Sequence, residues 1–216
     1  MYSRSELELC IEWSRKHSMH IISDEIYALS ILPGSQMLSI AEIDTDYPKI
    51  HIAGGLSKDF GVSGFRVGIL YSKNQEIIKG MGGVGYFQGV SNVTQHVMTE
   101  VFSDEKWLEE YVMVNQKRIG ENYNALKEAL AVIDVKLFES SGTLMAWADF
   151  RSCLPENPTW EDEEALCIRL SEECGWLTTP GKTCISDKPG FFRLVYTEAG
   201  IENLIELKDR LSKFKK

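Results

Sequence analysis

The sequence predicts an α/β fold built around a parallel β-sheet. An amphipathic helix over residues 3–16 is predicted to place Leu7, Cys10 and Ile11 on its inner face. It leads into a short apolar strand over residues 19–23, and a second apolar strand spans Ile50–Ala53. Both strands are nearly continuous in apolar character, which is typical of strands in parallel sheets. A helix that feeds into such strands indicates α/β architecture. In these sheets, sites lie beyond the carboxyl ends of the strands.

The remaining elements of the first half follow from the same patterns. A third apolar strand spans residues 67–71, and a helix begins near Gln75. Five glycines between positions 80 and 89 are expected to break this helix and form a hinge or contact loop. The glycine run lacks the lysine of a phosphate-binding loop and follows no strand, so a nucleotide-binding domain is disfavoured. Residues 90–102 are predicted to form the next helix.

A long helix over residues 103–133 is predicted to join two domains, residues 1–115 and residues 116–216. The second domain is expected to be a smaller layer of strands and helices. A capping box at Thr159 and Asp162 opens a helix that Gly175 ends. The predicted strands span residues 135–138, 143–150, 176–179 and 191–196, and a final helix spans residues 201–214.

Composition excludes several classes of function. A formal net charge of −9 argues against nucleic acid as a partner. The five cysteines are odd in number and lack metal-binding spacing, which predicts reduced thiols, no metal site and a cytoplasmic protein. No apolar run approaches the roughly 20 residues that span a bilayer. The hydrophobic content of 44% is that of an ordinary globular protein.

Two cations lie on a glycine-rich connection after the second strand, which is expected to be an irregular loop. Lys58 follows the strand closely, and Arg66 comes eight residues later, just before the third strand. A lysine at the mouth of a buried strand suits an amine that forms an imine, and a guanidinium suits a phosphate. Taken alone, the stretch is also compatible with two solvated surface cations.

Three further residues are candidates for a functional site. Asp24 directly follows the first strand, and Tyr27 comes three residues later, so the chain must leave strand geometry after Asp24. An exposed strand-end carboxylate beside a half-buried tyrosine would also explain the pair. Arg193 lies inside an aromatic and apolar strand and needs either an anionic partner or a route for its head group to water.

The run from Gly55 to Gly68 resembles the pattern S-L-S-K-x-[FM]-G-x-x-G-x-R-x-G around the cofactor lysine of class I/II aminotransferases. These are fold-type I enzymes that use pyridoxal 5'-phosphate (PLP). Within this family, the chain is most similar to the branch of 1-aminocyclopropane-1-carboxylate (ACC) synthase and its homologues. The resemblance covers nearly the whole chain and implies an aspartate aminotransferase-like fold.

The resemblance also implies a role for each candidate residue. Lys58 would carry the Schiff base to PLP, and Arg66 would hold the cofactor phosphate. Asp24 would pair with the protonated ring nitrogen, and Tyr27 would hydrogen-bond the phenolic oxygen of the ring. Arg193 would bind the α-carboxylate of the substrate in a bidentate salt bridge.

One residue departs from the family pattern. Gly55 stands where the family has a phosphate-binding serine, which leaves Ser57 as the nearby hydroxyl that is a candidate cofactor ligand.

Family members are roughly twice as long as this chain. Residues 1–115 would therefore be the late part of the large PLP-binding domain, and residues 116–216 the small C-terminal domain. The leading hypothesis is PLP chemistry at the α-carbon of an amino acid, as an aminotransferase or an ACC synthase-like lyase, in a full-length homodimer. The alternative is a truncated, catalytically incompetent module of the same fold that acts through a partner.

Overall fold

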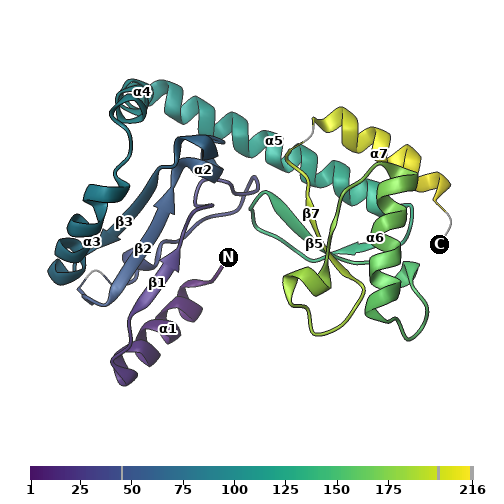
Figure 1. Cartoon of the computed structure of the whole chain (residues 1–216), viewed down its shortest axis with the longest axis horizontal. Helices are drawn as coiled ribbons and strands as arrows, with labels where there is room; N and C mark the ends of the chain where they lie inside the picture. The colour runs from purple at the N-terminus through teal and green to yellow at the C-terminus, as the bar shows by residue number, and fades with distance from the viewer. Residues whose placement is uncertain (45, 199, 215–216) are drawn as a thin grey trace. The chain divides into compact units, whose positions relative to one another are not determined.

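The computed structural model describes residues 1–44, 46–198 and 200–214 of the chain. The chain divides into two compact units, Met1–Asn115 and Gln116–Lys216 (Figure 1). Each unit contains its own β-sheet, of three strands in the first and four in the second. The long helix α5 (Glu105–Ala131) contributes residues to both units.

The sheet of the first unit has the strand order β1-β2-β3. Strand β1 (Ile21–Asp24) runs parallel to β2 (Ile50–Gly55), as the apolar patterns predicted. Strand β3 (Gly68–Ser72) returns antiparallel to β2, with Gly55 opposite Gly68. The connection between β2 and β3 is therefore closed at its base by the sheet itself, and it contains α2 (Leu56–Asp59) and the 3₁₀ turn η2 (Ser63–Phe65).

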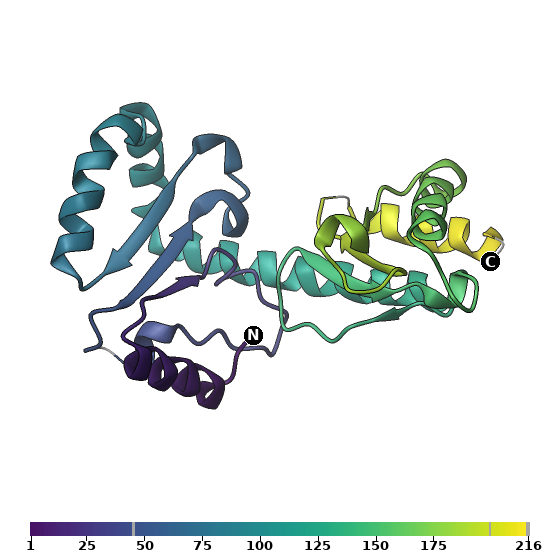
Figure 2. The same cartoon turned by 60° about the horizontal axis from the view of Figure 1, so that its bottom comes forward.

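Helix α1 (Arg4–His17) packs on this sheet beside β1 (Figure 2). A capping box between Ser3 and Glu6 starts the helix and satisfies its first amide groups. Leu7 and Ile11 are buried in a core with three residues from later in the chain, Ile40, Tyr47 and Ile50. Ile40 belongs to the short 3₁₀ turn η1 (Ile40–Glu42). Burial of one apolar stripe thus holds α1 against the sheet.

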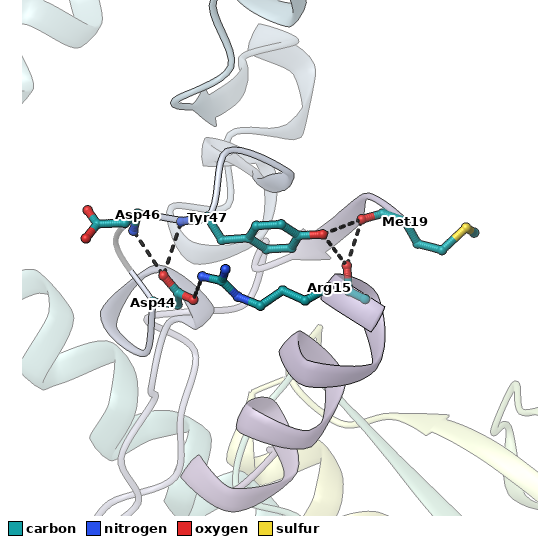
Figure 3. A network of polar contacts seen from close by, with 6 residues as sticks. Arg15, Met19, Asp44, Asp46 and Tyr47 are labelled. Carbon is teal, nitrogen blue, oxygen red and sulfur yellow. Dashed lines mark hydrogen bonds and ion pairs between the residues drawn. The ribbon is translucent and has the colours of Figure 1, made fainter. Parts of the chain in front are cut away.

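A polar network fastens the end of α1 to the segment before β2 (Figure 3). The hydroxyl groups of Tyr47 and Ser14 donate to the Met19 carbonyl at 3.0 and 2.7 Å. Asp44 accepts from the Tyr47 amide at 3.1 Å and forms an ion pair with Arg15. These contacts fix where β1 and β2 begin, and hence the register in which their carboxyl ends meet.

Helix α3 (Gln75–Gln88) runs through the glycines that were expected to interrupt it. The sequence prediction of a loop over residues 80–89 is therefore wrong. Asn74 caps the helix by accepting from the amides of Glu76 and Ile77 at 3.0 and 3.2 Å. Each glycine disfavours a helix by about 1 kcal/mol relative to alanine without forbidding it. Helix α4 (Asn92–Phe102) follows, as predicted.

A chain of polar side chains crosses the sheet near the start of β1. His20 Nδ1 lies 2.7 Å from His51 Nε2, and His51 Nδ1 lies 2.7 Å from the Ser72 hydroxyl. His51 is only 4% exposed. Burial, and to a lesser extent the neighbouring His20, lowers the pKa of His51 below its ordinary value.

The second unit is an antiparallel sheet in the order β4-β5-β7-β6 with helices packed beside it (Figure 1). Ala148, Phe150, Phe192, Leu194 and Tyr196 form its buried interior with residues of α5. The capping box at Thr159 is present, and Gly175 ends that helix, as predicted. The elements are β4 (Lys136–Leu137), β5 (Met145–Asp149), η3 (Arg151–Cys153), α6 (Trp160–Cys174), β6 (Thr179–Pro180), η4 (Gly181–Cys184), β7 (Phe191–Val195) and α7 (Ile201–Lys213).

The described residues contain neither a helix that could span a membrane nor a cluster of metal-binding side chains. Among residues 1–44, 46–198 and 200–214, every helix is too short or too polar to cross a bilayer. In the same part of the chain, no group of three or more His, Cys, Asp or Glu side chains is arranged to hold a metal ion.

Candidate functional site

Asp24 lies at the carboxyl end of β1, beside the carboxyl end of β2. The parallel register pairs Asp24 with Ala53, and the Glu25 amide donates to the Ala53 carbonyl at 2.8 Å. The Asp24 side chain is exposed, and its Oδ1 accepts from the Ile26 amide at 3.2 Å. A carboxylate is thereby available at the sheet edge where α/β proteins bind their ligands.

Tyr27 lies in the turn that follows β1. The strand ends at Asp24, so the predicted departure from strand geometry is confirmed. Tyr27 is half-buried, and its carbonyl accepts from the Ser30 amide at 3.1 Å. Asp24 therefore ends the strand and Tyr27 lies in the turn that follows, so the two do not occupy opposite faces of one strand.

Lys58 lies on α2, a single helical turn that begins directly after β2. The expectation that Lys58 sits on an irregular loop is wrong, because Leu56–Asp59 is helical and the Phe60 amide donates to the Leu56 carbonyl at 3.2 Å. Leu56 is buried and anchors the turn, while the side chains of Ser57 and Lys58 are half-buried. Lys58 is thus held on a defined element at the same sheet edge as Asp24.

Arg66 ends the connection between β2 and β3. It follows η2 in the left-handed conformation, with φ of 56°, and its side chain is exposed. Its Nη1 donates to the Ser63 carbonyl at 3.1 Å, which holds the side chain over its own loop. Among the described residues this is the only hydrogen bond given to the guanidinium, so its other donors face solvent.

The presence of glycine at position 55 has a steric explanation, which the sequence alone does not reveal. A Cβ atom at this position would lie 2.8 Å from the backbone oxygen of Val67. The same oxygen accepts from the Leu56 amide at 3.3 Å, so it cannot move without straining the base of the connection. A serine at position 55 would therefore force Val67 or the base of the connection to shift.

Asp59 was missed by the sequence analysis. It is the residue after Lys58, it is 6% exposed, and its carboxylate accepts from the Ser30 hydroxyl at 2.7 Å and the Leu29 amide at 3.2 Å. Burial raises the pKa of Asp59, although the hydrogen bonds from Ser30 and Leu29 oppose the shift. The only sequence signal was an acidic residue in an otherwise apolar and glycine-rich stretch.

Arg193 belongs to the second unit. It lies on β7, opposite Trp147 of β5 and Thr179 of β6, and its side chain is exposed. Its Nη2 is 3.4 Å from the Thr179 hydroxyl, and Phe191 on the same strand stacks on Trp147 at 6.1 Å. The guanidinium thus reaches solvent from a sheet face that also presents aromatic rings.

The first unit brings together five of the six predicted site residues. Asp24 and Tyr27 lie on the connection after β1, and Ser57, Lys58 and Arg66 lie on the connection after β2. This arrangement combines a carboxylate, a phenol, a hydroxyl, an amine and a guanidinium around the carboxyl ends of two adjacent parallel strands. The sixth residue, Arg193, lies in the other unit.

The chain belongs to the aminotransferase class I and II family, whose model matches residues 1–207. Its fold corresponds to about half of the aspartate aminotransferase fold. The Thermus thermophilus aspartate aminotransferase double mutant matches 99% of this chain with a TM-score of 0.84 and 23% identity, and the match covers 53% of that protein. The expected family and the incomplete aspartate aminotransferase-like fold are both confirmed.

Curated relatives point to the ACC synthase branch. 1-Aminocyclopropane-1-carboxylate synthase 11 of Arabidopsis thaliana is 31% identical over 98% of this chain, which spans 47% of that protein. The probable inactive 1-aminocyclopropane-1-carboxylate synthase-like protein 2 of Mus musculus is 31% identical over 92% of this chain and is covered to 34%. The chain therefore spans less than half the length of these relatives.

Proposed function

We propose that the protein acts on the α-carbon of an amino acid with pyridoxal 5'-phosphate as cofactor, and that Lys58 forms the Schiff base to that cofactor. The observation that carries the proposal is the pairing of Asp24 with Ala53 in parallel strands, with Lys58 on the turn that follows. Carboxylate and amine are thus presented at one sheet edge. Family membership supports the choice of cofactor.

The residues present fit this cofactor in kind and in charge. Pyridoxal 5'-phosphate carries an anionic phosphate, a phenolic oxygen, an aldehyde and a ring nitrogen, and it supplies an electron sink for bonds at the α-carbon. The donor-rich guanidinium of Arg66 suits the phosphate. The exposed Asp24 carboxylate suits a protonated ring nitrogen, and the Tyr27 phenol suits the phenolic oxygen.

Each side chain then has one task. Lys58 would hold the cofactor, and its amine would serve as the general base that takes the proton from the α-carbon of the substrate. Asp24 keeps the ring nitrogen protonated. Arg66 and Ser57 hold the phosphate, and Arg193 orients the substrate carboxylate through its planar fork. We extend the proposal to a cytoplasmic protein, in line with five cysteines that form no disulfide. We also propose that the full-length protein is a homodimer.

Two reaction types are open to such a site. With the cofactor bound, such a site would support either transfer of the amino group or an ACC synthase-like reaction that releases a γ leaving group and closes a three-membered ring. The relatives include named ACC synthases, which favours the second type. Product analysis with an amino acid that carries a γ leaving group would separate the two.

A second candidate function is a catalytically incompetent module of the same fold that acts through a partner. The similarity to a relative named as probably inactive favours it. So do large apolar side chains of the first unit that are far more exposed than is usual for a monomer, notably Ile22 at 73%, Val93 at 76%, and Tyr86 and Phe87 at 86% each. An apolar groove lined by Leu56, Ile69, Met98 and Phe102 lies on the same unit.

Titration with PLP distinguishes the two candidates. The proposed enzyme develops a visible absorbance band that saturates and that is absent in Lys58→Arg. The matched control is Lys79→Arg, which changes an exposed lysine on α3 of the same unit and should keep the band. Absence of the band at high PLP in the unmodified chain would reject the enzymatic proposal and leave the module.

A further inference from the structure

Asp59 joins the two connections that carry the proposed site. It is the last residue of α2, immediately after Lys58. Its Oδ1 accepts from the Ser30 hydroxyl at 2.7 Å and its Oδ2 accepts from the Leu29 amide at 3.2 Å. Leu29 and Ser30 belong to the segment that starts at Asp24 and passes through Tyr27. One side chain therefore ties the Lys58 turn to the segment after β1.

The chemistry of this link favours a carboxylate. Both oxygens of Asp59 accept from donors, as an ionised acid can on both sides. Asp59 is 6% exposed and Ser30 is fully buried, so water cannot readily replace the Ser30 hydroxyl. An amide at position 59 can accept from the Leu29 amide only if its NH₂ group donates to Ser30, so the hydroxyl would have to turn from donor to acceptor, and both hydrogen bonds would lose the charge of the carboxylate.

The backbone around Asp59 is fixed from the other side as well. The Tyr111 hydroxyl donates to the Asp59 carbonyl at 3.2 Å, and the Tyr111 ring stacks on Phe60 with ring centroids 5.3 Å apart. The α2 turn is thus held between helix α5 on one side and the segment after β1 on the other. On the side of the segment after β1, the α2 turn is held by the hydrogen bonds of the Asp59 carboxylate.

We propose that Asp59 is a positioning residue, whose buried carboxylate fixes the segment Asp24–Ser30 against the Lys58 turn and so sets the distance between the Lys58 amine and the Asp24 carboxylate. The inference rests on the proposed function in one respect only, because the proposed cofactor chemistry is what gives this distance a role in catalysis. A mispositioned amine of this kind lowers cofactor affinity and turnover even though every group that contacts the cofactor is intact.

The test compares Asp59→Asn and Ser30→Ala with a matched control, Glu163→Gln. Glu163 is fully buried in the second unit and accepts from the amides of Lys182 and Gly190 at 2.9 and 2.6 Å. The control thus removes a carboxylate of the same kind, and its cost to stability should resemble that of Asp59→Asn. It leaves the Lys58 turn untouched.

Two readouts need no cofactor. In Asp59→Asn, hydrogen exchange at the Leu29 amide should accelerate by about tenfold, because a hydrogen bond to a charged carboxylate is replaced by a weaker one to a neutral amide. Acylation of Lys58 by acetic anhydride, measured relative to Lys79, should also become faster. Ser30→Ala should give smaller changes in the same direction, and Glu163→Gln should change neither readout.

The third readout is the dissociation constant for PLP, which should rise by about tenfold in Asp59→Asn and stay unchanged in Glu163→Gln. If Asp59→Asn matches the control in exchange at Leu29 and in labelling of Lys58, the inference is overturned. Failure of the unmodified chain to bind PLP overturns the proposed function instead, and the two cofactor-free readouts still decide on the Asp59 link.

Discussion

Replacing Gly55 with serine restores the family residue at the position where this chain departs from it. The structure predicts that the change is harmful. An added Cβ would stand 2.8 Å from the Val67 backbone oxygen, a distance that real Cβ contacts essentially never reach. That oxygen is already held by the Leu56 amide, and Gly55 is paired with Gly68 across the antiparallel strands. Relief therefore requires the base of the connection to open.

The expected cost follows from overpacking in a closely packed region, about 1–3 kcal/mol. For a unit of this size, a loss of that order lowers the Tm by about 4–12 °C. The assay is thermal unfolding followed by circular dichroism, with urea unfolding as a check on the free energy. Binding of PLP should weaken rather than improve, because Lys58 and Arg66 lie on the connection that is disturbed.

Gly54→Ser is the matched control. Gly54 precedes Gly55 on the same strand, and no atom lies within 4 Å of the position its Cβ would take. Its stability should change by no more than about 0.5 kcal/mol. Equal losses in the two variants would refute the steric explanation of Gly55, and so would a Gly55→Ser protein with unchanged Tm and tighter PLP binding.

Three further predictions concern charge and exposure. The pKa of His51 is lowered in the folded chain, so the unfolded chain binds the proton more tightly and the free energy of unfolding should fall as pH drops below about 6.5. Urea unfolding at pH 7 and pH 5 should show a smaller fall in His51→Asn than in the unmodified chain. An equal fall in both would exclude His51 as the cause. In a full-length relative, Asn at the aspartate that matches Asp24 should reduce turnover far more than Glu, because an amide cannot stabilise a protonated ring nitrogen; equal losses would assign Asp24 a structural role only. The 216-residue chain should self-associate, because Tyr86 and Phe87 are each 86% exposed; a monomer in light scattering would contradict this.

Local signals in the sequence predicted the elements well. The carboxylate at Asp24 marks the end of β1, and the capping box at Thr159 marks the start of α6, because both depend on residues a few positions apart. The α1 pattern correctly placed Leu7 and Ile11 in the core, whereas Cys10, predicted to face inward with them, is exposed.

Features set by distant contacts could not be predicted. Asp59 has its partners 29 and 30 residues earlier in the chain, and nothing in its local pattern distinguishes it from a surface acid. The need for glycine at position 55 arises from Val67 across the hairpin. The start of α3 near Gln75 was predicted, but its continuation to Gln88 was not, because glycine has a low helix propensity that the rest of this helix overcomes.

Borohydride reduction of the chain loaded with one equivalent of PLP, followed by peptide mass spectrometry, tests most directly whether Lys58 binds the cofactor. Reduction converts a Schiff base into a stable secondary amine, so even a weak adduct is captured at its site. The predicted result is a pyridoxyl label on the peptide that contains Lys58, lost in Lys58→Arg and retained in Lys79→Arg. A label distributed over other lysines with Lys58 unmodified, or no label at all, would contradict the assignment.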